Sequence, residues 1–174
     1  MPNESLSSAM KEVYALAPND RVPLATLQLS HPALESSIYM VQDRVVHNFT
    51  LEPDSEGNPG ITVEFEPVPF RFTAPTSGED GLQELSIAID NVDRRITDFL
   101  DLVGTERAPV ELTYRPYLSD DPTKPQLDPP LMLYLTDVRI NAFEVSGRAT
   151  FSNIINLKYP TEYYDRKRFP GLGG

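Results

Sequence analysis

The chain of 174 residues contains no cysteine, no tryptophan and only two histidines, His31 and His47. Without cysteine it cannot build a disulfide framework, a thiolate zinc site, an iron–sulfur cluster or a cysteine nucleophile. No apolar run approaches the ~18 residues that a membrane-spanning helix needs, and the first residues lack the pattern of a secretory signal. We therefore expect synthesis in a reducing cytoplasm and no membrane insertion.

Positive charge is also scarce, because the chain has 15 basic side chains and 26 acidic ones, which gives a net charge of -11. Such a balance disfavours a surface that binds nucleic-acid phosphates over the whole chain, so we expect no specific nucleic-acid binding. Hydrophobic residues make up 40% of the chain. This content is sufficient for a packed core and argues against wholesale disorder.

Proline is abundant, with 17 residues, about twice its average use. The prolines separate runs rich in Val, Ile, Leu, Phe, Tyr and Thr, which is typical of β-strands bounded by turns. Residues 61–72 alternate most clearly, and Pro67 and Pro69 predict an edge strand or a bulge there. The pattern as a whole predicts a mainly β fold, a β-sandwich or barrel.

One internal helix is expected between the strands at 82–89 and 109–118. Five apolar residues recur at helical spacing from Val92 to Val103, with Asp90 or Asn91 as the N-cap and Gly104 as the C-cap. We therefore expect this helix to pack on one face or end of the sheet.

Three regions follow from these patterns. Residues 1–20 form an N-terminal arm with a short amphipathic helix over 5–16, residues 21–159 form the β-rich domain, and residues 160–174 form an extended tail. Within the domain, 131–145 and 148–159 are expected to pair as a hairpin, with its turn at 144–148 and Gly147 supplying a positive φ. The same register places Phe143 and Val145 opposite Phe151 and Ile155.

Catalytic patterns are absent from the sequence. His31 precedes a proline at a strand end, His47 lies within a strand, and no Gly-x-Ser-x-Gly motif is present to expose a serine. We expect structural or surface roles for both histidines and no enzymatic activity. A cell-wall hydrolase remains a third alternative, which a zymogram would test.

Acidic turns at 54–58, 79–81 and 119–121 offer oxygen ligands, but none has the full spacing of a calcium loop. Acidic and glycine-bearing turns also arise from turn geometry alone. We expect no metal and no cofactor, while a carbohydrate- or calcium-binding β-sandwich for adhesion stays open as the alternative function.

Tyrosine, arginine and phenylalanine are concentrated near the end of the chain. Such residues anchor protein interfaces, and the acidic body favours a protein partner over a nucleic acid. Arms that are unstable alone are commonly used to clasp a neighbour. The predicted subunit-interface residues are Met10, Val13, Tyr14, Tyr163, Tyr164, Arg166, Arg168 and Phe169.

The segment from Leu85 to Ile96 resembles a family of phage tail proteins. That family is catalogued only as a domain of unknown function and is encoded among the tail-tip genes of long-tailed, non-contractile phages. The resemblance extends from about Leu24 to Leu172 and is supported by 109–115, 151–160, Tyr163-Tyr164 and Phe169-Pro170-Gly171.

This resemblance implies a hub-type β-domain in a structural virion protein of the tail tip. The protein would be made in the host bacterial cytoplasm and would form a ring, as a trimer or a hexamer, between the distal tail protein and the central hub. It would contribute to tail assembly and DNA passage, with its acidic residues lining the channel. The chain is more distantly similar to the lambda-like tail-tip protein, whose iron–sulfur cluster it cannot share because it has no cysteine.

Overall fold

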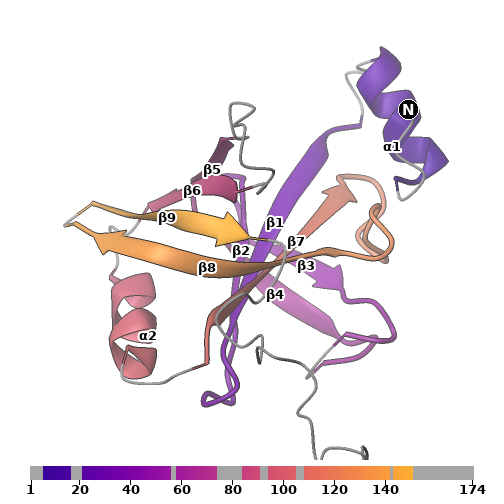
Figure 1. The fold of residues 1–174 in the computed structure, drawn as a ribbon. Coiled ribbons are helices and arrows are strands. Elements are labelled where there is room, and N and C mark those ends of the chain that lie inside the picture. The colour runs from indigo at the N-terminus through magenta and orange to yellow at the C-terminus, as the bar shows by residue number, and fades with distance from the viewer. Residues whose placement is uncertain are drawn as a thin grey trace, which may run out of the picture.

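The computed structural model describes residues 6–16, 21–55, 58–73, 84–90, 94–104, 108–141 and 143–150. These residues form nine strands and two helices (Figure 1), which confirms the expected mainly β fold. The elements are α1 (Ser8–Leu16), β1 (Pro23–Ser30), β2 (Ile38–Val41), β3 (His47–Thr50), β4 (Thr62–Pro67), β5 (Phe70–Thr73), β6 (Glu84–Asp90), α2 (Arg95–Val103), β7 (Val110–Leu118), β8 (Leu131–Ile140) and β9 (Glu144–Thr150).

All nine strands belong to one sheet, in the order β3-β4-β2-β1-β7-β8-β9-β6-β5. Strands β4 and β5 lie near opposite ends of this order, yet only Val68 and Pro69 connect them. Since two residues span less than about 10 Å, the sheet must roll until its ends meet. This connection is hydrogen-bonded to strands from both halves of the sheet. The Val68 amide donates to the Val41 carbonyl on β2, and the Asp90 amide on β6 donates to the Pro69 carbonyl. The sheet is therefore a barrel-like roll.

The main core fills the inside of the roll. Leu29, Leu112 and Leu133 follow one another across β1, β7 and β8 and are almost completely buried. Helix α2 adds its apolar stripe to the same cluster. A second, aromatic cluster lies on the other face of β1 and β7, where Phe49 stacks on Tyr117 with ring centroids 4.2 Å apart.

Helix α2 keeps the expected apolar stripe and ends at Val103 with Gly104 as its C-cap residue, as expected, but its start differs from the prediction. Four of its buried residues are Ile96, Phe99, Leu100 and Val103. The helix begins at Arg95, and its N-cap residue Arg94 has a φ of 62° and makes no side-chain cap. Asp90 instead ends β6, and Asn91 lies outside the described residues. Gly104 has a right-handed φ of -62°, so it is not a left-handed C-cap.

The β8–β9 hairpin has a different turn from the one expected. The strands are connected at Asn141, whose Oδ1 atom accepts hydrogen bonds from the amides of Phe143 (2.9 Å) and Glu144 (2.7 Å). Gly147 is inside β9 opposite Ile87 and has no positive φ. A Cβ at Gly147 would lie 3.1 Å from a Leu135 methyl carbon, so close packing explains this glycine. Phe151 and Ile155 lie outside the described residues.

The edge strand predicted around Pro67 and Pro69 is not β4, which pairs with β3 on one side and β2 on the other, but β5 after Pro69 is the last strand in the sheet order. Pro67 is tolerated because it is the last residue of β4, and Val68 supplies the next donor to β2. The alternation before it holds only in part. Phe65 is buried and Val63 is half-buried, whereas Ile61 precedes the strand and is exposed.

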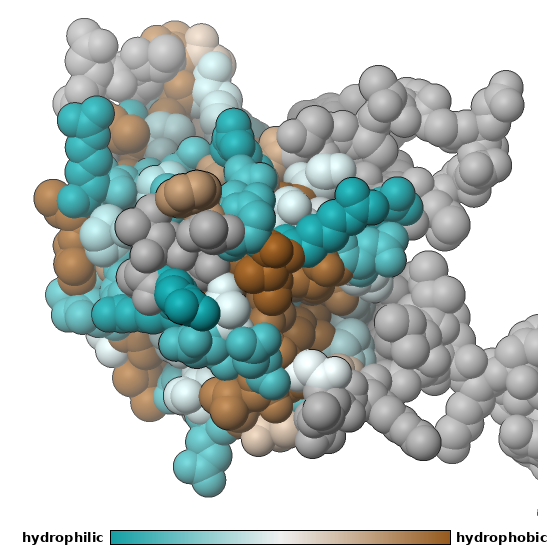
Figure 2. All heavy atoms as spheres, turned by 90° about the vertical axis from the view of Figure 1, so that its left-hand side faces the viewer, coloured by the Kyte–Doolittle hydropathy of each residue, from teal (hydrophilic) through white to brown (hydrophobic). Residues whose placement is uncertain are grey.

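Figure 2 shows the end of the molecule that presents α2 and the β8–β9 hairpin, the left-hand side of Figure 1. Hydrophobic side chains reach the surface there and lie among hydrophilic ones. No helix in the described part of the chain has both the length and the apolar character to cross a membrane.

Candidate functional site

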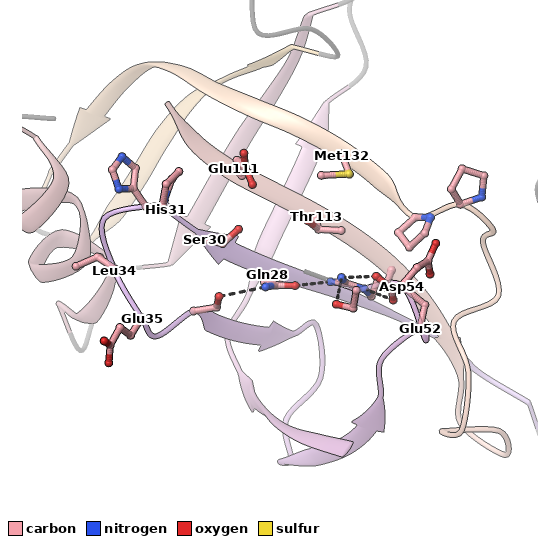
Figure 3. A pocket seen from close by; sticks show the side chains of 16 residues that line it. Gln28, Ser30, His31, Leu34, Glu35, Glu52, Asp54, Glu111, Thr113 and Met132 are labelled. Atoms are coloured by element: carbon pink, nitrogen blue, oxygen red, sulfur yellow. Dashed lines mark hydrogen bonds and ion pairs between the residues drawn. The ribbon is translucent and has the colours of Figure 1, made fainter. Parts of the chain in front are cut away.

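A polar cleft of about 410 Å³ lies on the outer face of β1 and β7 (Figure 3). Its walls come from the turn after β1, which carries His31 and Glu35, and from the loop after β3, which carries Glu52 and Asp54. The far rim is formed by Pro129 and Pro130, just before β8. These segments converge because β1 and β7 are paired along their whole length in the middle of the sheet.

The floor of the cleft is built around Arg115, whose side chain is only 3% exposed. Its Nε and Nη2 atoms donate to the two carboxylate oxygens of Glu52 at 2.7 and 2.6 Å, and Nη1 donates to Gln28 Oε1 at 2.7 Å. Gln28 in turn donates to Ser37 Oγ at 3.1 Å. The planar guanidinium matches a carboxylate in this two-pronged geometry. The network therefore fastens two loops to the sheet.

The charge on Glu52 is maintained by this network. Burial alone would raise the pKa of Glu52, but the hydrogen bonds from Arg115, with further hydrogen bonds and the arginine charge, bring the pKa below its usual value. Both members of the pair are thus ionised and neutralise each other. This arrangement resembles a structural ion pair more than a pair of groups prepared for proton transfer.

The two histidines also have structural contacts. The Ala33 amide donates to His31 Nδ1 at 3.1 Å, so His31 Nε2 carries the proton and donates to the Ala108 carbonyl at 3.0 Å. His47 Nε2 lies 2.6 Å from Asp43 Oδ2, a hydrogen bond that lowers the pKa of Asp43. These contacts agree with the expected structural roles of both histidines.

The acidic turns were candidates for calcium binding. In the turn at 119–121, Asp120 pairs with Arg21 at 2.8 Å, and Asp121 accepts hydrogen bonds from Thr123 and Gln126. The pKa of Asp121 is lowered mainly by the Thr123 hydroxyl. The rest of these turns is only partly described, because 56–57 and 79–81 lie outside the described residues. Within the described ranges, no group of three or more His, Asp or Glu side chains is arranged to hold a metal ion.

The three predicted interface residues of the arm have different surroundings. Met10 and Val13 are buried against Leu118 of their own chain, at 0% and 4% exposure, so they fix α1 to the domain instead of facing a neighbour. Ser7 strengthens this anchor, because its hydroxyl donates to Gln126 Oε1 and accepts from the Met10 amide. Tyr14 is 60% exposed, and its interface role stays a prediction. The other predicted interface residues lie outside the described part, namely Tyr163, Tyr164, Arg166, Arg168 and Phe169.

An exposed apolar surface lies near the hairpin turn, and the sequence patterns did not indicate it. We call it the apolar tip and define it by Val138, Ile140 and Phe143, which are 38%, 44% and 75% exposed. Leu102 on α2 is also exposed, at 67%. The sequence did contain one indication of this surface, because asparagine is a common turn residue. A turn predicted at Asn141 would have placed Phe143 next to the turn and not in a paired strand position.

A second groove, of about 430 Å³, lies between α1 and the segment that leads into β8. It is lined by Tyr14, Tyr114, Leu127 and Leu131 with three prolines, so its walls are largely apolar. The pKa of Tyr114 is raised to about 12, mainly by burial and also by the nearby Tyr14. We call this the arm groove.

A third, shallower hollow of about 380 Å³ contains Arg71, Arg139 and Arg148 around Gly147. Arg71 pairs with Glu144 at 2.9 Å, and Arg148 lies 3.7 Å from Asp137. Most of its positive charge is therefore matched locally.

Together these features define a mainly β protein with one rolled sheet, a polar cleft with a buried ion pair at its floor, and an exposed apolar tip on the β8–β9 hairpin. Residues 9–164 match the family described as Domain of unknown function (DUF1833), and the chain belongs to that family. No curated protein matches the chain.

Proposed function

We propose that this chain is a structural protein of a phage tail tip, which forms a ring between the distal tail protein and the central hub. Its role would be assembly and DNA passage, with no catalysis. The resemblance of residues 85–96, which include β6 and the start of α2, supports this assignment. The structural observation that most supports this proposed function is the apolar tip.

The apolar tip exposes groups that a solitary soluble domain normally buries. Phe143 is three-quarters exposed, at the end of a hairpin. Burying an aromatic or aliphatic side chain of this size contributes roughly 1.5–3 kcal/mol. Val138 and Ile140, near the same hairpin turn, are also exposed, and exposed apolar patches mark protein interfaces. The function they favour is assembly.

A closed ring needs two different surfaces on each subunit, one for each neighbour. The hairpin turn and α1 lie at opposite ends of the view in Figure 1. The apolar tip of one copy would therefore enter the arm groove of the next, where Tyr14 and Tyr114 supply aromatic walls. This head-to-tail contact is compatible with either a trimer or a hexamer.

The net charge of -11 fits a position near passing DNA, because acidic walls repel a phosphate backbone. Exposed carboxylates such as Glu64 and Asp54 would contribute to such a wall. Glu66 is less suited to it, because it pairs with Arg95. A map of the assembled tail with a neutral or basic channel at this protein would contradict that role.

The proposal is tested by Phe143→Asp in the gene of a phage that encodes this chain. We expect normal amounts of folded protein and a strong loss of assembled, infectious tails. Ile61→Asp is the matched control, since Ile61 is exposed at 52% but is not part of the apolar tip. Normal tails that contain the Phe143 variant would overturn the role of the tip. Absence of the wild-type chain from purified particles would overturn the function itself.

A further inference from the structure

The polar cleft has an acidic mouth above its neutral floor. Arg115 is the only lysine or arginine among the described residues that line it, and its charge is matched by Glu52. Glu35 and Asp54 are exposed at the mouth. The cleft therefore presents a negative surface that favours a cationic occupant.

The cleft also offers apolar surface beside these carboxylates. Leu34, Met132 and Pro129 line it, and Met132 is 46% exposed. Long basic side chains suit such a lining, because their methylene stems pack on apolar surface while their charged ends reach carboxylates. An occupant with several arginine or lysine side chains would use both kinds of surface.

The described chain ends close to this cleft. Ser30, Glu111, Tyr134 and Thr150 are paired in one row across β1, β7, β8 and β9. Neighbouring strands are about 4.8 Å apart, so Thr150 lies roughly 10 Å from Glu111. The 15 residues of 151–165 then separate Thr150 from Arg166. A linker of this length reaches up to about 50 Å, which is far more than the distance required.

We propose that the cleft is the docking site for the basic segment Arg166-Lys167-Arg168 of the same chain. These three consecutive cations complement the acidic mouth, and the linker gives them a high effective concentration at the cleft. The segment would thus be held against its own domain. This inference does not depend on the proposed tail-tip function, because it uses only the cleft and the chain that follows β9.

The absence of cysteine allows a direct test in the full-length protein. Glu35→Cys with Lys167→Cys places one thiol at the mouth and one in the segment, and oxidised glutathione is then added to dilute protein. The control pair is Glu12→Cys with Lys167→Cys, since Glu12 is exposed on α1. We expect an internal disulfide to form about tenfold faster in the first pair. The difference should shrink strongly at about 1 M salt, where exposed charges are screened.

Equal rates for the two pairs would overturn the proposal, and so would a predominantly dimeric product, which would show that a neighbour's segment occupies the cleft. Adding Arg166→Glu and Arg168→Glu to the first pair should reduce its rate to that of the control. Adding Arg166→Lys and Arg168→Lys should leave the rate nearly unchanged. A charge-reversed variant that closes as fast as its parent would also overturn the proposal. Circular dichroism of each variant verifies that the fold is intact.

Discussion

Arg115 and Glu52 form a two-pronged ion pair between positions 63 residues apart in the sequence. Arg115 is on β7 in the middle of the sheet, and Glu52 lies in the loop after β3. Their side chains are 3% and 13% exposed, so each would be poorly solvated without the other. The pair therefore connects the outer aromatic cluster to the central strands and shapes the floor of the polar cleft.

Glu52→Gln should destabilise the fold markedly, because it leaves the buried Arg115 cation without a charged partner. Loss of one member of a buried pair typically costs about 3–5 kcal/mol. We expect a decrease of about 3 kcal/mol in the free energy of unfolding, measured by urea denaturation.

The matched control is Glu64→Gln, because Glu64 is exposed on β4 and should change stability by less than about 0.5 kcal/mol. The double variant Glu52→Gln with Arg115→Met should recover part of the loss, since no buried charge then remains unpaired. If Glu52→Gln unfolds at the same urea concentration as the wild type, the ion pair does not stabilise the fold.

Stability should fall in acid, and Glu52 should account for a distinct part of the loss. The pKa of Glu52 is lower in the folded state than its usual value of 4.5, so the unfolded chain binds its proton more readily. The contribution of Glu52 is therefore complete above the unfolded-state pKa and is lost as pH falls through the folded-state pKa. Urea midpoints measured from pH 7 down to about pH 3 should decline less steeply in Glu52→Gln than in the wild type. Parallel declines would argue against this assignment.

The aromatic cluster on the outer face should be sensitive to truncation. Phe49 is 1% exposed, stacks on Tyr117 and meets Phe65 edge-on at 5.3 Å. Phe49→Ala should lower the free energy of unfolding by about 4 kcal/mol, through lost burial and the cavity that remains. Val45→Ala serves as the control, because Val45 is 56% exposed. A loss below about 1 kcal/mol for Phe49→Ala would show that this cluster is not a packed core.

The arm should detach when its anchor is shortened. Met10 is fully buried against Val13 and Leu118. A helix of nine residues is not stable on its own, so α1 depends on this contact. Met10→Ala should increase amide hydrogen exchange within α1 at least about tenfold while β1 and β7 keep their protection. Lys11→Ala, at an exposed position, should leave the exchange of α1 nearly unchanged. Unaltered exchange in Met10→Ala would mean that other contacts hold the arm.

The sequence was a reliable guide where a periodic pattern coincided with one local element. The stripe of α2 predicted Ile96, Phe99 and Leu100 as buried, because helical spacing alone decides which side chains share a face. The start of α2 was not predictable in the same way. Asp90 is the last residue of β6. The pairing of β6 with β5 and β9 outweighs the preference of Asp90 for a helix N-cap position.

Features that depend on distant pairing were missed. The interior position of β4 follows from the rolling of the sheet, which no local pattern around Pro67 records. Likewise, Glu52 and Arg115 are ordinary charged residues in the sequence, and only the pairing of β1 with β7 brings Gln28 and Arg115 together. The apolar tip was missed because the turn was placed at Gly147 instead of Asn141.

We propose that this chain is a structural part of a phage tail tip, and a cryo-EM map of the purified particle would test this role. We expect the rolled nine-stranded domain to fit density at the tail tip in several copies around the tail axis. We further expect the apolar tip, with Phe143 at its end, to lie against the arm groove of the neighbouring copy. A particle whose tail-tip density contains no copy of this fold would contradict the proposed structural role.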